Sequence, residues 1–282
     1  MDPMKRSYKT ADTAANEGID NNFNVIRCYR GRCFNRKHAL VREESILIRI
    51  DGHPYSTVMR TPGDEVFHAA GFCLSEGIVE NTDDFISIGF GRDIDPNVVD
   101  IRLHPSRRGH FSSLLERRGS TNQTSCGISG KEMVDQICRI LAPVIDETSI
   151  GLKNALRLIK QLPRIQHLHK KTYGSHAVIL VNSRSDILAV AEDVGRHNAF
   201  DKAIGKLLMS GKLTEASIGV LSSRISYEMI YKAARAHIPI LLSASRPTAL
   251  AVHLGKRLNM TLACAARESE LIIFCGEGRI NR

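Results

Sequence analysis

Residues 217–252 read SIGVLSSRISYEMIYKAARAHIPILLSASRPTALAV, and their pattern decides the fold of the second half of the chain. The apolar run 218–221 is followed by polar residues and then by a helical pattern over residues 226–236. A second apolar run, 238–242, is followed by another helical pattern, over residues 247–258. Because short apolar strands alternate with helices, the stretch predicts an α/β layer with a mainly parallel central sheet.

The same alternation extends outward from this stretch. Further strands are expected at residues 177–181, 187–191, 261–265 and 271–274, and a further helix at residues 197–209. Two helices are expected before them, over residues 131–142 and 149–162, the first of which stops near Pro143. We therefore place a domain boundary near residue 145 and predict an α/β domain over residues 146–282.

The first half has a different pattern, which predicts an α+β domain over residues 25–145. Residues 45–60 read as a hairpin turning at Asp51 and Gly52. A helix is expected to begin at Thr61 as N-cap and to end at Gly77. Short strands follow at 85–90 and 98–103. The remaining segments are assigned without regular helix: residues 1–24 as a disordered tail, 27–38 as a surface loop or edge strand, and 104–120 as a basic loop.

Composition restricts the class of protein. The 282 residues carry 39 basic and 30 acidic side chains, a formal charge of +9 that favours anionic partners. Aromatic residues make up only 5%, and no zinc finger or RNA-binding signature is present, so we expect no nucleic-acid partner. No apolar run is long enough to span a membrane, and because residues 1–22 are polar we expect no secretory signal. Seven cysteines without disulfide spacing predict a reduced, cytoplasmic protein.

Polar residues gather where the predicted strands end. The junctions AEDVGRHNAFDK, SSRISYEM and SASRPTALAV carry Arg196, Arg224 and Arg246, and the last strand-end adds Arg267. The carboxyl ends of parallel strands meet at one edge, where helix N-termini and arginines suit phosphate groups. A highly anionic ligand is predicted there, with ordinary solvated loops as the alternative. His197 reads as part of a satisfied loop network, and no P-loop or GxGxxG supports nucleotide hydrolysis or hydride transfer.

One cysteine lies in a setting that favours reactivity. Residues 121–131 read TNQTSCGISGK, which places Cys126 among small residues and cations just before a predicted helix. A thiol in such a turn ionises more easily than a free one. The alternative is a cysteine that only packs in the core.

Several of these stretches together resemble one known family. TSCGISGKE, AEDVGRHNAFDKAIG and RTPGDEVFHAAGFCLSEGIV are similar to the formate dehydrogenase accessory sulfurtransferase family, FdhD. The resemblance implies a persulfide carrier, with Cys126 as the catalytic residue, and a cytidine-deaminase-like second domain lacking the zinc site. It also implies a segment that binds the cofactor Mo-bis(molybdopterin guanine dinucleotide). That segment is Ala265, Ala266, Arg267, Glu268, Ser269 and Glu270, to which Arg196, Arg224 and Arg246 are added.

The resemblance also implies partners. Sulfur is expected to come from a cysteine desulfurase and to serve the catalytic subunit of a formate dehydrogenase, with guanine nucleotides as possible cofactor surrogates, no zinc and a homodimeric assembly. The family motif usually reads CGxCG, but Ser129 stands in the place of its second cysteine. Two alternatives stay open: a cofactor-binding chaperone without sulfur transfer, and a nucleotide deaminase-like enzyme.

Overall fold

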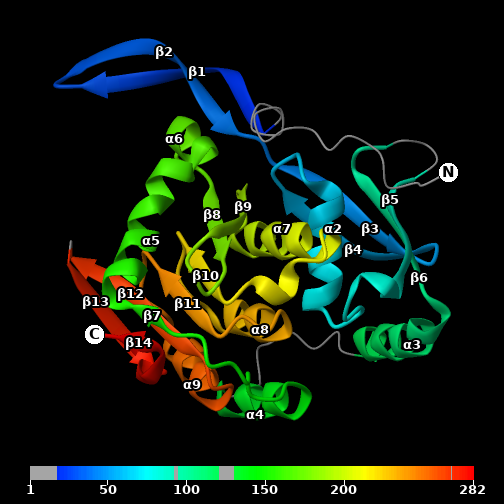
Figure 1. Cartoon of the computed structure of the whole chain (residues 1–282). Coiled ribbons are helices and arrows are strands. Elements are labelled where there is room, and N and C mark those ends of the chain that lie inside the picture. The colour runs from blue at the N-terminus through cyan, green and yellow to red at the C-terminus, as the bar shows by residue number, and fades with distance from the viewer. Residues whose placement is uncertain (1–17, 92–94, 121–129, 268) are drawn as a thin grey trace.

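The computed structural model describes residues 18–91, 95–120, 130–267 and 269–282 (Figure 1). The second half is built on a six-stranded sheet with the order β13-β12-β11-β10-β8-β9. These strands are β8 (His176–Val181), β9 (Ile187–Asp193), β10 (Ile218–Leu221), β11 (Ile240–Ser243), β12 (Thr261–Arg267) and β13 (Glu270–Cys275). All six lie where the sequence predicts strands, to within about two residues, the usual uncertainty at strand ends.

The prediction of a mainly parallel sheet is wrong. The pairs β10–β11 and β11–β12 are parallel, whereas β8–β9, β8–β10 and β12–β13 are antiparallel. The reason is connection length, because only five residues join β8 to β9 and only two join β12 to β13. A parallel crossover needs a dozen residues or more, so such short links can only form hairpins.

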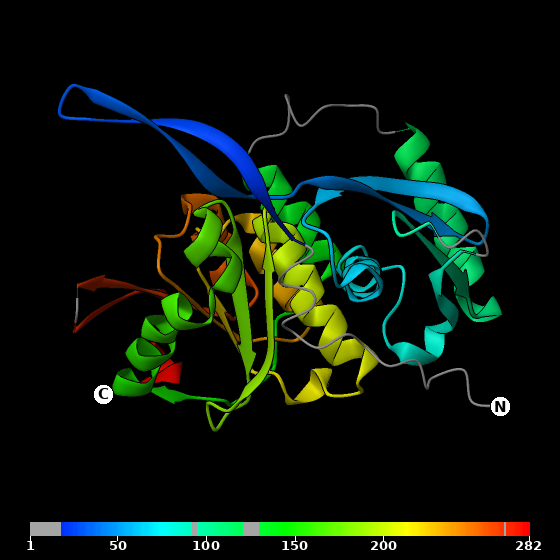
Figure 2. The same ribbon diagram turned by 90° about the horizontal axis from the view of Figure 1, so that it is seen from above.

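Helices cover both faces of this sheet (Figures 1 and 2). On one face α5 (Leu152–Ile165) packs against Ile179 and Val181 of β8. The neighbouring residues Val178 and Leu180 point to the other face, into the larger core cluster. Alternate residues of β8 therefore enter two separate cores, as expected for a strand buried on both sides. The helices of the second face are α7 (Arg196–Met209), α8 (Tyr227–Arg235) and α9 (Ala249–Arg257).

The first half contains a four-stranded sheet with the order β4-β3-β6-β5. The predicted hairpin is confirmed, since Asp51 and Gly52 both have positive φ, 48° and 84°. Helix α2 (Glu65–Ser75) crosses from this half onto α7, and its Gly71 lies against the α7 backbone. The elements are β3 (Glu44–Ile50), β4 (His53–Arg60), α2 (Glu65–Ser75), a 3-10 turn at Thr82–Asp84, β5 (Phe85–Phe90) and β6 (Val98–Leu103).

Two predictions for the first half are wrong. Residues 105–120 form helix α3 (Pro105–Ser120) rather than a basic loop. Its apolar Phe111, Leu114 and Leu115 recur at helical spacing and pack on the core, a weak signal among basic and serine residues. Helix α2 begins at Glu65, four residues after the expected N-cap, because Thr61 is occupied elsewhere: its hydroxyl accepts the Val194 N–H at 2.9 Å.

The region near the N-terminus also differs from the prediction. Strands β1 (Ile19–Tyr29) and β2 (Arg32–Val41) form an antiparallel hairpin, so the predicted tail, residues 1–24, overlaps a strand. Residues 1–17 lie outside the described part. Cys28 and Cys33 are directly opposite in this hairpin and are joined by a disulfide. The expectation that all cysteines are reduced is wrong for this pair. The spacing of the cysteines in the sequence does not indicate a disulfide, but the tight turn of the hairpin brings these two thiols together.

The remaining elements complete the surface. Within the described ranges no helix is long and apolar enough to cross a membrane. Those not yet named are α4 (Gly130–Ile140), α6 (His167–Thr172), β7 (Ile150–Gly151), β14 (Ile280–Asn281) and the 3-10 turns Leu213–Glu215 and Glu277–Arg279. Among them, α4 packs against α9.

Candidate functional site

Strands β9, β10, β11 and β12 all end at one edge of the six-stranded sheet, which we call the carboxyl edge. Although β9 is an outer strand, it is antiparallel to β8, which is antiparallel to β10, so β9 points the same way as β10. The loops that carry Arg196, Arg224 and Arg246 therefore leave the sheet at this edge, together with the end of β12. His176 also lies at the carboxyl edge, because this first residue of β8 is paired with Asp193, the last residue of β9.

The predicted site residues have different settings at this edge. Arg224 and Arg246 are exposed, Arg196 is half-buried, and Ala265 is half-buried against a cavity. Ala266, Ser269 and Glu270 are exposed at the β12–β13 turn, and Arg267 is the last residue of β12. Cys126, Ser129 and Glu268 lie outside the described residues.

A cavity of about 490 Å³ opens beside the carboxyl edge, between α5, α6 and the strand ends. We call it the α5 cavity. Its polar lining includes Gln166, His169, Ser175, His176 and Ser222, and Ala265 lies on one side. The pKa of His176 lies below its ordinary 6.5, chiefly because the ring is partly buried and next because Arg196 is near. This cavity is thus lined by hydrogen-bonding side chains, with an arginine close to His176.

A carboxylate organises the rim of the α5 cavity. Glu192 accepts the N–H groups of Leu168 and His169, each at 3.0 Å, and the Ser175 hydroxyl at 3.1 Å. It therefore holds the start of α6 against β9, where a helix leaves its first N–H groups without helical partners.

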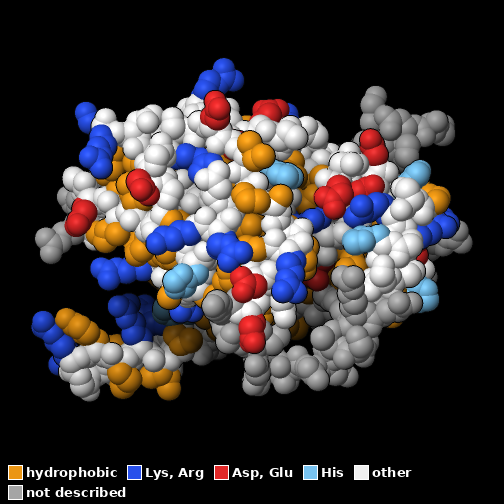
Figure 3. Space-filling view, turned by 90° about the horizontal axis from the view of Figure 1, so that it is seen from below, with side chains coloured by type: hydrophobic (Ala, Val, Ile, Leu, Met, Phe, Trp, Pro, Cys, Tyr) orange, Lys and Arg blue, Asp and Glu red, His pale blue; other side chains and the backbone are white. Residues whose placement is uncertain are grey.

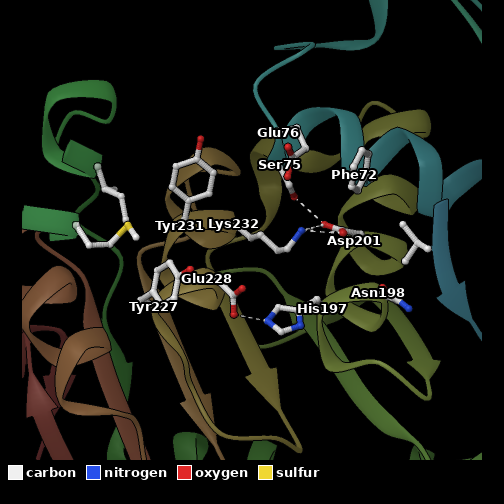
Figure 4. A pocket seen from close by; sticks show the side chains of 13 residues that line it. Phe72, Ser75, Glu76, His197, Asn198, Asp201, Tyr227, Glu228, Tyr231 and Lys232 are labelled. Atoms are coloured by element: carbon white, nitrogen blue, oxygen red, sulfur yellow. Dashed lines mark hydrogen bonds and ion pairs between the residues drawn. The ribbon is translucent and has the colours of Figure 1, made fainter. Parts of the chain in front are cut away.

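A second cavity, of about 430 Å³, lies on the other face between α2, α4, α7 and α8 (Figure 4). We call it the α8 cavity. Asp201 accepts two hydrogen bonds from the Lys232 ammonium, both 2.7 Å, and one from the Ser75 hydroxyl, also 2.7 Å. His197 Nε2 lies 2.8 Å from a Glu228 carboxylate oxygen. This hydrogen bond is the main reason that the pKa of Glu228 lies below its ordinary 4.5.

The sequence analysis did not predict the two polar pairs of the α8 cavity, His197 with Glu228 and Asp201 with Lys232, although their spacing indicates them. His197 and Asp201 are four residues apart on α7, and Glu228 and Lys232 are four apart on α8. Residues at this spacing share a helix face, so two facing helices can present two polar pairs to one cavity. Met133 and Ile137 of α4 form the apolar wall.

Asp193 is part of a satisfied network, separate from His197. It is fully buried and accepts the N–H groups of Thr61 at 3.0 Å and Gly195 at 2.8 Å. Asn198 Nδ2 lies 2.9 Å from it, and the Lys202 ammonium lies 2.7 Å away. The network fixes the β9–α7 loop to the segment after β4, so it positions the carboxyl edge rather than a ligand.

A buried histidine next to this network makes stability depend on pH. Burial, followed by the charges of Lys202, Lys232 and Arg60, lowers the pKa of His68 well below 6.5. The unfolded chain therefore takes up a proton below about pH 6.5 that the folded chain does not bind, and stability falls as pH falls. His176, whose pKa is also lowered, acts in the same direction.

We therefore expect the free energy of unfolding in urea to decrease between pH 7.5 and 5.5. His68 contributes about 1.4 kcal/mol of this decrease, the linkage for one proton across one pH unit below its unfolded pKa. A His68→Leu variant should lose that part of the pH dependence whatever its stability at pH 7.5. An equal decrease in the variant would contradict a neutral buried His68.

The fold and the site together define a mixed α/β protein with an arginine-bearing sheet edge between two cavities. The part of the chain that the structure describes holds no cluster of three or more His, Cys, Asp or Glu able to bind a metal ion. The chain belongs to the FdhD/NarQ family, whose model matches residues 41–281.

Individual relatives agree with this assignment. The chain is 35% identical over 266 residues to the sulfur carrier protein FdhD of Streptomyces avermitilis, covering 91% of this chain and 94% of the relative. It is 34% identical over 241 residues to the sulfur carrier protein FdhD of Bordetella bronchiseptica, covering 86% and 87%. A formate dehydrogenase accessory protein of known crystal structure, from Desulfotalea psychrophila, has the same fold, with a TM-score of 0.72, 22% identity and coverage of 92% and 97%.

Proposed function

We propose that this protein is a sulfur carrier that matures a formate dehydrogenase. Its Cys126 thiolate attacks the outer sulfur of a persulfide on a cysteine desulfurase, the donor S–S bond breaks, and the donor thiolate leaves. Cys126 then holds the sulfur as a persulfide. The observation that supports this most is that relatives named sulfur carrier protein FdhD match about nine-tenths of the chain.

The cargo in this proposal is Mo-bis(molybdopterin guanine dinucleotide), whose molybdenum receives the sulfur. The α5 cavity supports a place for its guanine nucleotide end. At about 490 Å³ the cavity lies within the range of small-molecule sites, about 300–1,000 Å³. Ser175, Ser222 and the two histidines supply hydrogen bonds, and the arginine loops at the carboxyl edge supply charge for the pyrophosphates.

The proposal also includes features that resemblance suggests for the family. The cytoplasm is the proposed location, the assembly is a homodimer, and residues 146–282 have a cytidine-deaminase-like fold without zinc. The mixed sheet covered by helices on both faces is compatible with that fold. A nucleotide deaminase would need bound zinc to activate water, so metal analysis of the purified protein separates that alternative from a sulfur carrier.

Guanosine diphosphate serves as a probe for the cargo site. We expect Arg246→Ala to weaken its binding about tenfold to a hundredfold, because a hydrogen bond to a charged group contributes about 1.5–3 kcal/mol. Arg267→Ala is expected to act in the same way. Isothermal titration calorimetry measures both affinities.

The matched control is Arg184→Ala. The Arg184 side chain is 85% exposed in the β8–β9 turn, at the opposite edge of the sheet. Its replacement should therefore leave the affinity for guanosine diphosphate unchanged. If Arg184→Ala weakens binding as much as Arg246→Ala, the nucleotide is held by general charge rather than at the carboxyl edge.

A further inference from the structure

The polar groups that line the α5 cavity differ in which hydrogen bonds they have left to form. Gln166 is the clearest case, because it lies at the junction of α5 and α6 and is only 7% exposed. Its backbone N–H donates to the Leu162 carbonyl at 3.1 Å, and its carbonyl accepts the Lys170 N–H at 3.0 Å. Among the described residues, however, its side-chain amide has no hydrogen-bond partner. A buried amide is rarely left unpaired, so this one indicates a ligand in the cavity.

His169, three residues later on α6, offers a fixed acceptor to the same cavity. Its Nδ1 atom lies 2.9 Å from the Ser175 carbonyl oxygen. A carbonyl oxygen can only accept a hydrogen bond, so Nδ1 carries the proton. In the neutral ring the other nitrogen, Nε2, is then unprotonated and can only accept. The fold therefore sets the tautomer of His169 before any ligand binds.

Two serines and a second histidine complete the polar lining. The Ser175 hydroxyl donates its proton to Glu192 at 3.1 Å, so towards a ligand its oxygen can only accept. The Ser222 oxygen accepts the Ala177 N–H at 2.8 Å and keeps its own proton to donate. His176 has neither ring nitrogen bonded to a described residue, so it offers one donor and one acceptor when neutral. Together with the imidazole of α6, the cavity thus offers two fixed acceptors beside groups that can donate.

This pattern suits the base of a nucleotide rather than its phosphates. Fixed acceptors repel phosphate oxygens, which are acceptors themselves, whereas the arginine loops of the carboxyl edge attract them. The apolar part of the lining includes Leu162, Ala244 and Ala265, which can pack on the faces of a planar ring. We therefore expect the ring inside the cavity and the phosphates outside it, at the carboxyl edge.

Among the purine bases, guanine matches the pattern. Its edge carries a donor next to an acceptor, N1–H and O6, and beside them a 2-amino group that donates. The Gln166 amide also carries a donor next to an acceptor, so it can pair with N1–H and O6 through two hydrogen bonds. The 2-amino group then needs acceptors, which His169 and Ser175 supply. Adenine and hypoxanthine lack that amino group and would leave the fixed acceptors unpaired.

We propose that Gln166 and His169 determine the base specificity of the α5 cavity. The Gln166 amide pairs with N1–H and O6 of guanine, and His169 Nε2 accepts a hydrogen bond from the 2-amino group. This inference rests on the proposed function, which places the guanine nucleotide end of the cargo in this cavity, and it adds the residues that select the base.

The test compares two nucleotides that differ in one group. Guanosine diphosphate and inosine diphosphate have the same sugar and diphosphate, but inosine lacks the 2-amino group. Basic side chains, which Figure 3 shows interspersed with acidic ones over one face of the protein, attract the diphosphate of both equally. A difference in affinity therefore reports the base alone. Isothermal titration calorimetry measures both affinities with the full-length protein at about pH 8, where histidine is ordinarily neutral.

We expect the wild type to bind guanosine diphosphate about tenfold more tightly than inosine diphosphate, because the latter leaves a buried acceptor unpaired. His169→Phe should reduce this ratio to about threefold or less, since it removes that acceptor. His167→Phe is the matched control, because His167 is exposed at the start of α6 and does not line the cavity. It should keep the ratio of the wild type.

Gln166→Leu should act differently from His169→Phe. It is expected to weaken binding of both nucleotides about tenfold and to leave their ratio unchanged, because N1–H and O6 occur in both bases. The matched control is Gln161→Leu, the same change on α5 at a residue outside the cavity lining. Both affinities should be unchanged in that control.

Equal affinities of the wild type for the two nucleotides would overturn the inference, and this comparison needs no variant. So would a His169→Phe protein that keeps the wild-type ratio, or a Gln166→Leu protein that keeps the wild-type affinities. Loading of Cys126 by inorganic polysulfide, which needs no nucleotide, is measured in parallel. A wild type that prefers guanosine diphosphate but takes up no sulfur would refute the sulfur carrier and leave the base selection standing. A wild type that takes up sulfur but shows no preference would refute the base selection alone.

Discussion

Replacing Cys126 with alanine is expected to abolish sulfur loading by a cysteine desulfurase and all support of formate dehydrogenase activity. Five of the other six cysteines are unsuited to replace it. Cys73, Cys264 and Cys275 are buried, and burial is the main cause that raises the pKa of each thiol, so little thiolate forms at neutral pH. Cys28 and Cys33 are bonded to each other.

Cys138 provides the control for this prediction. It is a free, partly exposed cysteine on α4, the helix that follows the Cys126 segment. Cys138→Ala should load and support activity like the wild type. Both variants are assayed by complementation in a host lacking its own carrier. Full complementation by Cys126→Ala would contradict a mechanism in which Cys126 alone carries the sulfur.

Replacing Gly71 with alanine is expected to destabilise the fold more than any surface substitution. A Cβ atom on Gly71 would overlap the Asp201 carbonyl oxygen of α7, and one on Gly205 would overlap the Phe67 carbonyl oxygen of α2. The two helices touch backbone to backbone at these glycines. A backbone carbonyl cannot move aside as a flexible side chain can, so the two helices must separate. This separation costs about 3 kcal/mol of stability, the upper part of the range for overpacking.

Thermal unfolding measures this effect, as a decrease in Tm of about 6–12 °C for a chain of this size. The matched control is Gly109→Ala on α3, where an added Cβ meets no atom within 4 Å. That change should raise stability by up to about 1 kcal/mol, since alanine is the better helix former. An unchanged Tm for Gly71→Ala would show that α2 and α7 are not in close contact.

The elements of the second half could be predicted because each has a strong local pattern. The run 218–221 is apolar at every position apart from a glycine and forms β10, buried along its whole length. The helix expected over residues 226–236 is α8, Tyr227–Arg235. In such segments the burial pattern and the local propensity agree, so the sequence is sufficient.

The features that the sequence did not predict depend on contacts between segments that lie far apart in the chain. Thr61 looks like an N-cap, but its hydroxyl is taken by a residue 133 positions later. The Cys28–Cys33 bond depends on a register that only a formed hairpin defines. At the site, the strand order brings together the loops of Arg196, Arg224 and Arg246, as the pattern indicates. The ion pair of Asp201 and Lys232 needs the packing of α7 on α8.

The most direct test of the central claim is mass spectrometry of the wild-type protein after incubation with a cysteine desulfurase and cysteine. The intact mass should increase by one sulfur atom, about 32 Da, and the tryptic peptide that contains Cys126 should carry the whole increase as a persulfide. An unchanged mass, or a persulfide on any other peptide, would contradict the account.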